Sequence, residues 1–201
     1  MKKKLPVIIA FILTIAAAFW FAHIDKADRI YNNNVDTLSY VSVGVLENGE
    51  KFTQTIVCRE DIINGFQIKN SIQGEHESAT VRLEVRDAET DELIAVTEEP
   101  GSAFRRQKIH KYNTEQLTGM AGRKLKLSLT ETGSSMGSGI IMYYVPEKNS
   151  GYKAELDGNV LDGVMPAATV TERFDTETFI VFLLSLWFIW GFMWFLYRLF
   201  Q

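Results

Sequence analysis

The side chains that could do chemistry in this sequence of 201 residues are scattered, and their spacing matches no catalytic pattern. The three histidines, His23, His76 and His110, are isolated, so they lack the short spacing of metal ligands. No Ser/His/Asp arrangement has the context of an activated nucleophile. The single cysteine, Cys58, excludes an internal disulfide. We therefore expect no catalytic residues, no metal site, no cofactor and no enzymatic activity.

Ligand binding has more candidates than catalysis. A tyrosine ring can stack on the C–H face of a sugar, and a basic cluster can contact phosphate or anionic lipid. The possible ligand-binding residues are Tyr112, Tyr143, Tyr144, Arg105 and Arg106. Neighbouring residues of a strand point to opposite faces, so we expect one of Tyr143 and Tyr144 in the core and the other at the surface. Core packing of these rings, and a solvated basic edge strand, are the commoner explanations.

Two apolar runs bracket the chain and must position whatever lies between them. The C-terminal run, residues 178–197, is uncharged. As a helix it is about 30 Å long, the thickness of a bilayer core. The N-terminal run, residues 5–22, follows three lysines. We interpret it as an uncleaved signal anchor, and the alternative is a signal peptide with Ala16 and Ala18 before the cut. The expected domains are a transmembrane helix at 1–23, a linker at 24–37, a sandwich at 38–174 and a second transmembrane helix at 175–201.

The charges orient the chain and limit its partners. Lys2 to Lys4 and Arg198 flank the two runs, so the positive-inside rule predicts both termini in the cytoplasm and the central domain outside the cell membrane. The central region has 25 acidic and 17 basic residues, a net charge near −8, which argues against nucleic acid as a partner. Three acidic residues near one turn, Asp87, Asp91 and Glu92, could hold calcium, although a solvated turn is commoner.

The C-terminal run has an aromatic face that suits a helix partner. Trp187 and Trp190 lie too deep for an interfacial aromatic belt, and a glycine lies beside them. A glycine notch flanked by large rings favours close helix packing. We predict four partner-binding residues, Trp187, Trp190, Gly191 and Trp194. Their partner is another integral membrane protein or a seam of small residues in the N-terminal run, Ala10, Thr14, Ala18 and Ala22. A lipid-facing aromatic helix is the alternative.

Residues 38–174 consist of short alternating segments broken by turn residues, which is typical of an all-β domain. We expect strands over 40–45, 52–57, 62–68, 81–86, 93–97, 124–129, 140–145 and 167–174. A hairpin is expected across 157–159, a loop over 71–78 and no soluble helix. The pattern predicts a β-sandwich. We favour a jelly roll over an immunoglobulin fold, because the Cys…Trp…Cys core of the latter is absent.

The middle of the chain, about residues 50–165, also resembles the extracytoplasmic jelly-roll domain of poorly characterised bacterial cell-envelope membrane proteins. The resembling segments are 52–55 (FTQT), 63–68 (INGFQI), 81–87 (VRLEVRD), 92–93 (EL), 125–132 (LKLSLTET) and 154–159 (AELDGN). The group resembles glycosyltransferases or occurs with polysaccharide assembly systems. This chain lacks the additional membrane helices that would carry catalysis, so the resemblance implies no transferase activity.

The expected function is therefore that of a non-enzymatic membrane accessory protein in cell-envelope assembly. Its helices would contact membrane lipid and an integral membrane protein, and its sandwich would position a partner or a glycopolymer outside the membrane. The alternative is a membrane-tethered module that binds carbohydrate or another ligand.

Overall fold

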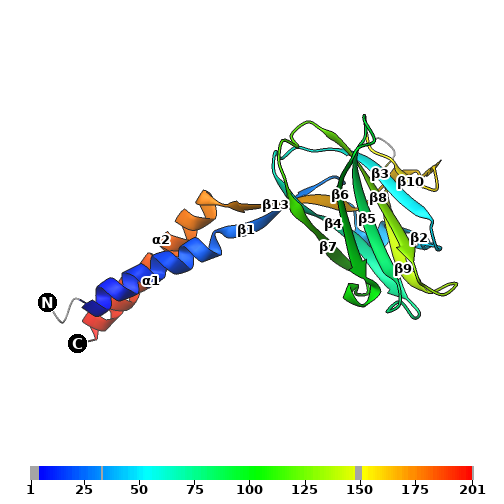
Figure 1. Ribbon diagram of the computed structural model, residues 1–201. Coiled ribbons are helices and arrows are strands. Elements are labelled where there is room, and N and C mark those ends of the chain that lie inside the picture. Colours follow the sequence, from blue (N-terminus) through cyan, green and yellow to red (C-terminus); the bar gives the residue numbers. More distant parts are fainter. Residues whose placement is uncertain (1–4, 33, 148–150, 201) are drawn as a thin grey trace. The chain divides into compact units, whose positions relative to one another are not determined.

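The computed structural model describes residues 5–32, 34–147 and 151–200 (Figure 1). Two compact units form. The helical unit contains the residues up to Lys26 together with those from Glu172 onward, and the sandwich unit contains Ala27 to Thr171. The basic cluster Lys2 to Lys4, on which the predicted orientation partly depends, lies outside the described residues.

The helical unit is built from α1 (Leu5–Phe21) and α2 (Thr176–Leu199), which pack against each other. The covered side of α1 is the small-residue seam, where Thr14, Ala18 and Ala22 are buried. Small side chains at every fourth position let two helices approach closely. The Thr14 hydroxyl donates to the Ala10 carbonyl at 2.8 Å, so this buried polar group has a partner inside its own helix. The predicted seam is therefore the packing surface of α1.

The start of α2 follows from its local sequence. Asp175 is the N-cap, and its Oδ1 accepts a hydrogen bond from the Thr178 N–H at 2.9 Å. Glu177 in the first turn and Arg198 in the last turn complement the helix dipole. With 24 residues, α2 is the one helix in the described chain that is long and apolar enough to cross a membrane. The described α1 has 17 residues and is shorter than a helix that meets this requirement.

The sandwich is made of two antiparallel sheets. The seven-stranded sheet has the order β1-β13-β4-β9-β12, with β2 paired to β9 and β7 paired to β4. The six-stranded sheet has the order β11-β10-β3-β8-β5-β6. The strands are β1 (His23–Arg29), β2 (Val41–Val45), β3 (Lys51–Val57), β4 (Ile63–Gln73), β5 (Thr80–Asp87), β6 (Leu93–Pro100), β7 (Lys108–Leu117), β8 (Lys124–Thr132), β9 (Gly139–Pro146), β10 (Ala154–Leu156), β11 (Asn159–Val160), β12 (Gly163–Val164) and β13 (Ala167–Phe174).

Most predicted strands are present, and parts of two segments that were predicted to be irregular are strand. Strand β4 runs on to Gln73, because Ser71 and Gln73 pair with Ile141 and Gly139 of β9. The start of the predicted loop at 71–78 is therefore strand. The predicted linker at 24–37 contains most of β1 and ends at the first residue of a 3₁₀ turn, Thr37–Ser39. Pairing with distant strands stabilises the strand parts of both segments. No local alternation of apolar and polar residues predicted this pairing.

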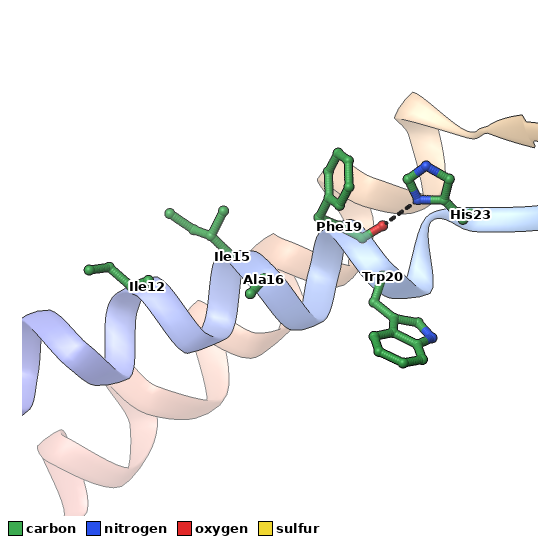
Figure 2. A pocket seen from close by; sticks show the side chains of 6 residues that line it. All are labelled: Ile12, Ile15, Ala16, Phe19, Trp20 and His23. Carbon is green, nitrogen blue, oxygen red and sulfur yellow. Dashed lines mark hydrogen bonds between the residues drawn. The ribbon is translucent and has the colours of Figure 1, made fainter.

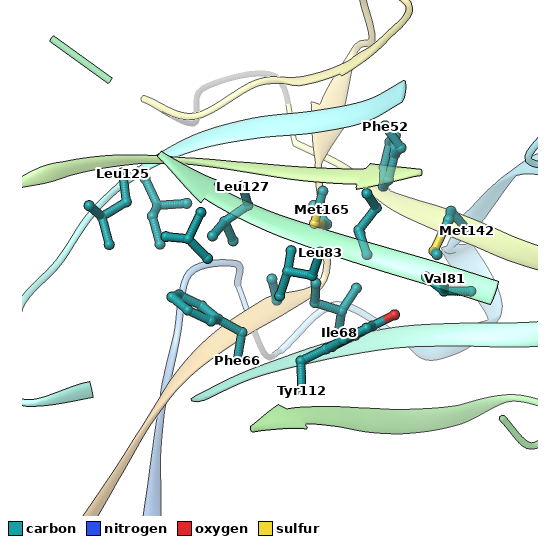
Figure 3. Close-up of a cluster of buried hydrophobic side chains, with 14 of the residues drawn as sticks. Phe52, Phe66, Ile68, Val81, Leu83, Tyr112, Leu125, Leu127, Met142 and Met165 are labelled. Atoms are coloured by element: carbon teal, nitrogen blue, oxygen red, sulfur yellow. The ribbon is translucent and has the colours of Figure 1, made fainter. Parts of the chain in front are cut away.

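The core lies between the sheets and follows the period of two along each strand. Leu83 of β5 and Leu125 and Leu127 of β8 are fully buried between the two sheets (Figure 3). Each such side chain stabilises the fold by roughly 1.5–3 kcal/mol. Cys58 is also buried in this core, and burial raises the pKa of its thiol to about 11. The thiol is therefore un-ionised and unreactive at neutral pH.

The sandwich unit has two ends, which we name after a carboxylate at each. Loops 46–50, 74–79, 101–107 and 133–138 form the Glu131 end, where Glu131 comes just before the last of these loops. Loops 58–62, 88–92 and 118–123 form the Asp87 end. Because loops tolerate irregular backbone and exposed polar groups, binding residues in such a fold concentrate at these ends or on the sheet faces.

Candidate functional site

The predicted partner-binding residues of α2 divide into two groups. Trp187 stacks on Phe11 of α1, with ring centroids 5.3 Å apart, and so belongs to the helix pair. Trp190 and Trp194 are 53% and 62% exposed, and they border a hollow of about 410 Å³ together with Ile189, Met193 and Tyr197. A Cβ placed on Gly191 would meet nothing within 4 Å. Gly191 therefore does not contact the small-residue seam, and Trp190 and Gly191 remain exposed in the described helical unit. Trp194 is also largely exposed, and the Arg198 guanidinium carbon lies 5.6 Å from its ring centroid.

A second hollow, of about 620 Å³, runs along α1 (Figure 2). Ile12, Ile15, Ala16 and Phe19 line it at one-turn spacing, with Trp20 and His23 at its end. The Nδ1 atom of His23 is 2.9 Å from the Phe19 carbonyl oxygen, which orients the ring. Apart from this imidazole the lining is apolar. Such a surface is compatible with lipid chains and lacks the convergent polar groups of a specific ligand site.

Tyr112, one of the predicted ligand-binding residues, is a core residue. It is fully buried on β7, where its ring makes edge contacts with His110 and packs near Phe104, at centroid distances of 4.9 and 6.1 Å. Burial raises the pKa of Tyr112 far above its usual range. The ring has no face at the surface for a sugar, because the alternation of β7 turns it inward. The prediction for Tyr112 is corrected accordingly.

Arg105 and Arg106 lie in the loop at 101–107 and are exposed. The Nη1 of Arg105 donates to the carbonyl oxygens of Ser102 and Phe104, at 2.6 and 2.8 Å. One of the two guanidinium groups therefore stabilises its own loop. Among the described residues, no hydrogen bond or ring contact joins either arginine to the candidate tyrosines of β9.

Tyr143 and Tyr144 point to opposite faces of β9, as expected. Tyr144 packs against the core, on the same side as Met142. Tyr143 is half-buried on the outer face of the seven-stranded sheet, opposite Ser42 of β2. Of the candidate tyrosines, Tyr143 is thus the one placed to meet a ligand.

Tyr40, whose ring is also a candidate for stacking on a sugar, and Tyr31, which the sequence did not single out, lie on this outer face. The rings of Tyr31 and Tyr40 meet edge to face, with centroids 6.2 Å apart. The ammonium nitrogen of Lys69 lies 5.2 Å from the centroid of the Tyr40 ring, a cation–π contact. Burial and then a hydrogen bond with Tyr31 raise the pKa of Tyr40 to about 12. Its phenol is therefore neutral at physiological pH. Residues this far apart in the sequence have no spacing that would have revealed the cluster.

At the Glu131 end, a buried carboxylate organises the loop at 133–138. Glu131 is fully buried, and its Oε2 accepts a hydrogen bond from the Ile140 N–H at 2.7 Å. Burial raises the pKa of this carboxyl, against the opposing effect of a hydrogen bond with the Ser134 side chain. A Cβ on Gly139 would overlap the Glu131 carboxylate, so glycine is required there. The sequence signal was available, because Glu131 continues the inward alternation of Leu127 and Leu129.

A hollow of about 480 Å³ lies over this loop. Asn48, Gln73, Ser135 and Ser138 line it, and the neighbouring Met136 is fully exposed. The Gln73 amide is already engaged, because its Nε2 donates to the Gly137 carbonyl at 3.0 Å. Glu47 also lines the hollow, so its polar lining consists of hydroxyl and amide groups and one carboxylate. This set of groups does not define a ligand.

At the Asp87 end, the acidic turn proposed as a calcium site has another use. The Asp87 Oδ2 accepts hydrogen bonds from Arg123 Nη2 at 2.6 Å and Nε at 3.2 Å. Its Oδ1 accepts from the N–H groups of Glu89 and Thr90. These bonds, with that to Arg123 first, lower the pKa of Asp87 to about 2. Among the described residues, no three metal-binding side chains come together.

Comparison with models of protein families and with curated proteins gives no match. The functional reading therefore depends on the two-sheet sandwich, on the long apolar α2 and on the surfaces described above.

Proposed function

We propose that this protein is a non-enzymatic accessory subunit of a cell-envelope assembly complex. It uses a pair of membrane helices to bind an integral membrane protein, and its sandwich positions a partner or a glycopolymer outside the membrane. The observation that carries the proposal is a difference in exposure between the two helices of the helical unit. The seam of α1 is buried within the unit, whereas Trp190, Gly191 and Trp194 of α2 remain largely exposed among the described residues.

Physical reasons favour a protein partner for this face of α2. In lipid, helices gain nothing from the hydrophobic effect on association, so packing depends on shape and van der Waals contact. A glycine beside large exposed rings offers close approach and a large contact area. The hollow of about 410 Å³ along Trp190, Met193 and Trp194 provides a matching recess.

In this proposal α1 also crosses the membrane as a signal anchor, and both termini are cytoplasmic. Its 17 described residues extend about 26 Å, a few ångströms less than a typical bilayer core. Local thinning of the bilayer accommodates a mismatch of this size at modest cost. If α1 were a cleaved signal peptide, the mature protein would lack it. The packing of the α1 seam would then have no role in the mature protein.

We infer that the sandwich is a jelly roll, and the strand pairings support this. The pairs β2–β9, β3–β8, β4–β7 and β5–β6 are nested, as in one long antiparallel ribbon folded over itself. Folding that ribbon gives the strand orders β2-β9-β4-β7 and β3-β8-β5-β6 within the two sheets. Nested pairing of eight strands in two sheets is the double Greek key of a jelly roll.

Co-purification from native membranes in mild detergent tests the accessory role. A Trp190→Leu, Gly191→Leu, Trp194→Leu variant keeps α2 apolar and spares Trp187, so insertion and the helix pair should survive. We expect the variant to lose its membrane-protein partner. A Phe188→Leu, Phe195→Leu control removes two rings from another side of α2 and should retain the partner. Equal retention by both variants would identify the tryptophan face as ordinary lipid-facing surface.

Cysteine labelling on intact cells tests the topology. In a Cys58→Ser background, Met136→Cys places a thiol at a fully exposed loop position, and Gln201→Cys places one at the C-terminus. An impermeant thiol reagent should label position 136 and leave position 201 unlabelled. Labelling at 201 alone would reverse the orientation.

A carbohydrate-binding module is the second candidate function. The specific observation in its favour is the cluster of tyrosines on the outer face of the seven-stranded sheet, with Lys69 held against the Tyr40 ring.

A further inference from the structure

The outer face of the seven-stranded sheet carries a group of side chains that we call the tyrosine patch. Its members are Tyr31, Tyr40, Tyr143, Lys69 and Arg29. Tyr31, Tyr40, Tyr143 and Lys69 are half-buried, and Arg29 is exposed. Each therefore presents part of its surface to solvent.

The sheet register explains why these residues meet. Ser42 pairs with Tyr143, and Tyr40 stands two residues before Ser42, so Tyr40 and Tyr143 are diagonal neighbours on one face. Asn70 pairs with Met142 with both side chains in the core, which turns the preceding Lys69 outward beside Tyr143. The contact of Lys69 with the Tyr40 ring fits this placement.

Among the described residues, the cations of the patch form no ion pair. In the part of the chain that the structure describes, Lys69 and Arg29 have no carboxylate within 4 Å, and the ammonium group of Lys69 contacts the Tyr40 ring. Arg82 and Arg86 of the other sheet and Arg123 in the loop before β8, in contrast, all have carboxylate partners. Two unpaired cations beside tyrosine rings, in a domain with excess acid, provide local positive charge for an anionic ligand.

The position of the patch disfavours a peptide strand as the ligand. Strand β4 pairs with β7 along one edge and with β13 and β9 along the other. Strand β9 is likewise paired with β2, β4 and β12. Neither of these two strands offers an edge for β-augmentation, so a ligand over Lys69 and Tyr143 would be contacted by side chains. Strand β2, which pairs with β9 on one side, is an edge strand. Ring faces complement the C–H surfaces of sugars, and cations complement their acidic groups.

We propose that the tyrosine patch binds an anionic glycan, with the tyrosine rings against sugar faces and Lys69 and Arg29 on carboxylate or phosphate groups. This inference names the polymer class for the sandwich and rests on that part of the proposed function. The inference does not depend on α2. Failure of the co-purification test of the α2 tryptophan face and failure of glycan binding by the tyrosine patch can therefore be distinguished.

Binding of defined polymers to the full-length protein in uncharged detergent tests the patch. The probes are polygalacturonate, its fully methyl-esterified form, which has the same sugar chain without charge, and polyglutamate. Lys69→Met removes the ammonium but keeps an apolar stem, and Tyr143→Ala removes one ring. The control is an Arg105→Met, Arg106→Met variant, which removes two exposed cations elsewhere. A thermal melt of each variant confirms that the sandwich is folded.

We expect polygalacturonate to bind the wild type more tightly than the methyl ester, and Lys69→Met to weaken that binding by about tenfold. Tyr143→Ala should weaken the binding of both glycans, and the arginine control should change the affinity for either glycan by less than twofold. Polyglutamate binding as tight as that of polygalacturonate would make the patch a site for acidic peptides and overturn the proposal. No binding at millimolar sugar, or loss only in the arginine control, would also overturn it.

Discussion

Asp87 and Glu131 are the same chemical group at opposite ends of one sandwich, and their surroundings drive their ionisation in opposite directions. Asp87 accepts two hydrogen bonds from Arg123 and two from turn N–H groups, which lower its pKa to about 2. Glu131 is fully buried, and burial raises its pKa. None of the described residues forms an ion pair with Glu131, whose Oε1 also lacks a hydrogen-bond partner.

The difference separates two uses of a carboxylate. At the Asp87 end, the charge itself is stabilised and fastens the 88–92 turn to Arg123. At the Glu131 end, a buried carboxyl holds the loop at 133–138 through Ile140 and Ser134, although ionisation there opposes stability. The loop that depends on this carboxyl also lines the hollow of about 480 Å³. A group retained at a cost to stability, beside a hollow, is more informative about function than a well-paired one.

The largest effect is expected from a carboxylate introduced into the core, where it would have neither the arginine partner of Asp87 nor the hydrogen bonds of Glu131. Leu83→Asp places one in the middle of the core, where Leu83 is 0% exposed. An unpaired buried carboxylate should lower the unfolding free energy by several kcal/mol, on the order of the whole stability of a marginal domain. Chemical denaturation of the full chain, followed by the β signal in circular dichroism, measures it. Leu93→Asp, at a half-exposed position of β6, is the control and should have little effect.

The next largest effect concerns the space that Glu131 needs. Gly139→Ala should lower the unfolding free energy by roughly 1–3 kcal/mol, because the added Cβ overlaps the carboxylate and the residue has φ of +139°. Gly137→Ala in the same loop has φ of +74° and open space around its Cβ, so it reports the backbone contribution alone. A loss in Gly139→Ala no greater than that in Gly137→Ala would contradict the proposed overlap.

At the Asp87 end, Asp87→Asn should lower the melting temperature by several degrees at pH 7, because Arg123 loses its charged partner. The folded-state pKa of Asp87 lies below its ordinary value of 3.8. The stabilisation is therefore present above that value and disappears as the pH falls toward about 2. Melting curves of both proteins between pH 2 and pH 7 should converge at the acidic end. A constant difference across that range would exclude ionised Asp87 as its source.

The smallest effect on stability is expected at the Glu131 end, and its sign is opposite to that of Asp87→Asn. The folded-state pKa of Glu131 lies above its ordinary value of 4.5, so the folded state binds this proton more tightly. Wild-type stability should therefore fall as the pH rises from about 4.5 through the folded-state pKa. Glu131→Gln keeps an acceptor for Ile140 and removes that dependence, so it should melt a few degrees higher at pH 7 and about equally at pH 4. A variant that is less stable at pH 7 would assign Glu131 the same role as Asp87.

Several features of this protein were determined by local sequence. The uncharged run at 178–197 is sufficient to specify an apolar helix of membrane length, because hydrophobicity and helix rise are local properties. The alternation at 81–86 and 124–129 identifies both the strands and their inward faces, including Leu83 and Leu127. The turn at 157–159 likewise specifies the β10–β11 hairpin. In each case the pattern has the period of the element that it encodes, so no distant contact is needed to recognise it.

Tertiary structure decided the features that depend on partners far away in the chain. Pairing with β9 makes strand of residues 71–73, and pairing in the seven-stranded sheet makes a strand within the predicted linker. The same pairings turn Tyr112 inward and bring Tyr40, Lys69 and Tyr143 together on one face. Sheet register is set by the hydrophobic faces and turns of all the strands at once. For that reason, the sequence identified Tyr143 as a candidate, and only the folded sheets determined that Lys69 and Tyr40 are its neighbours.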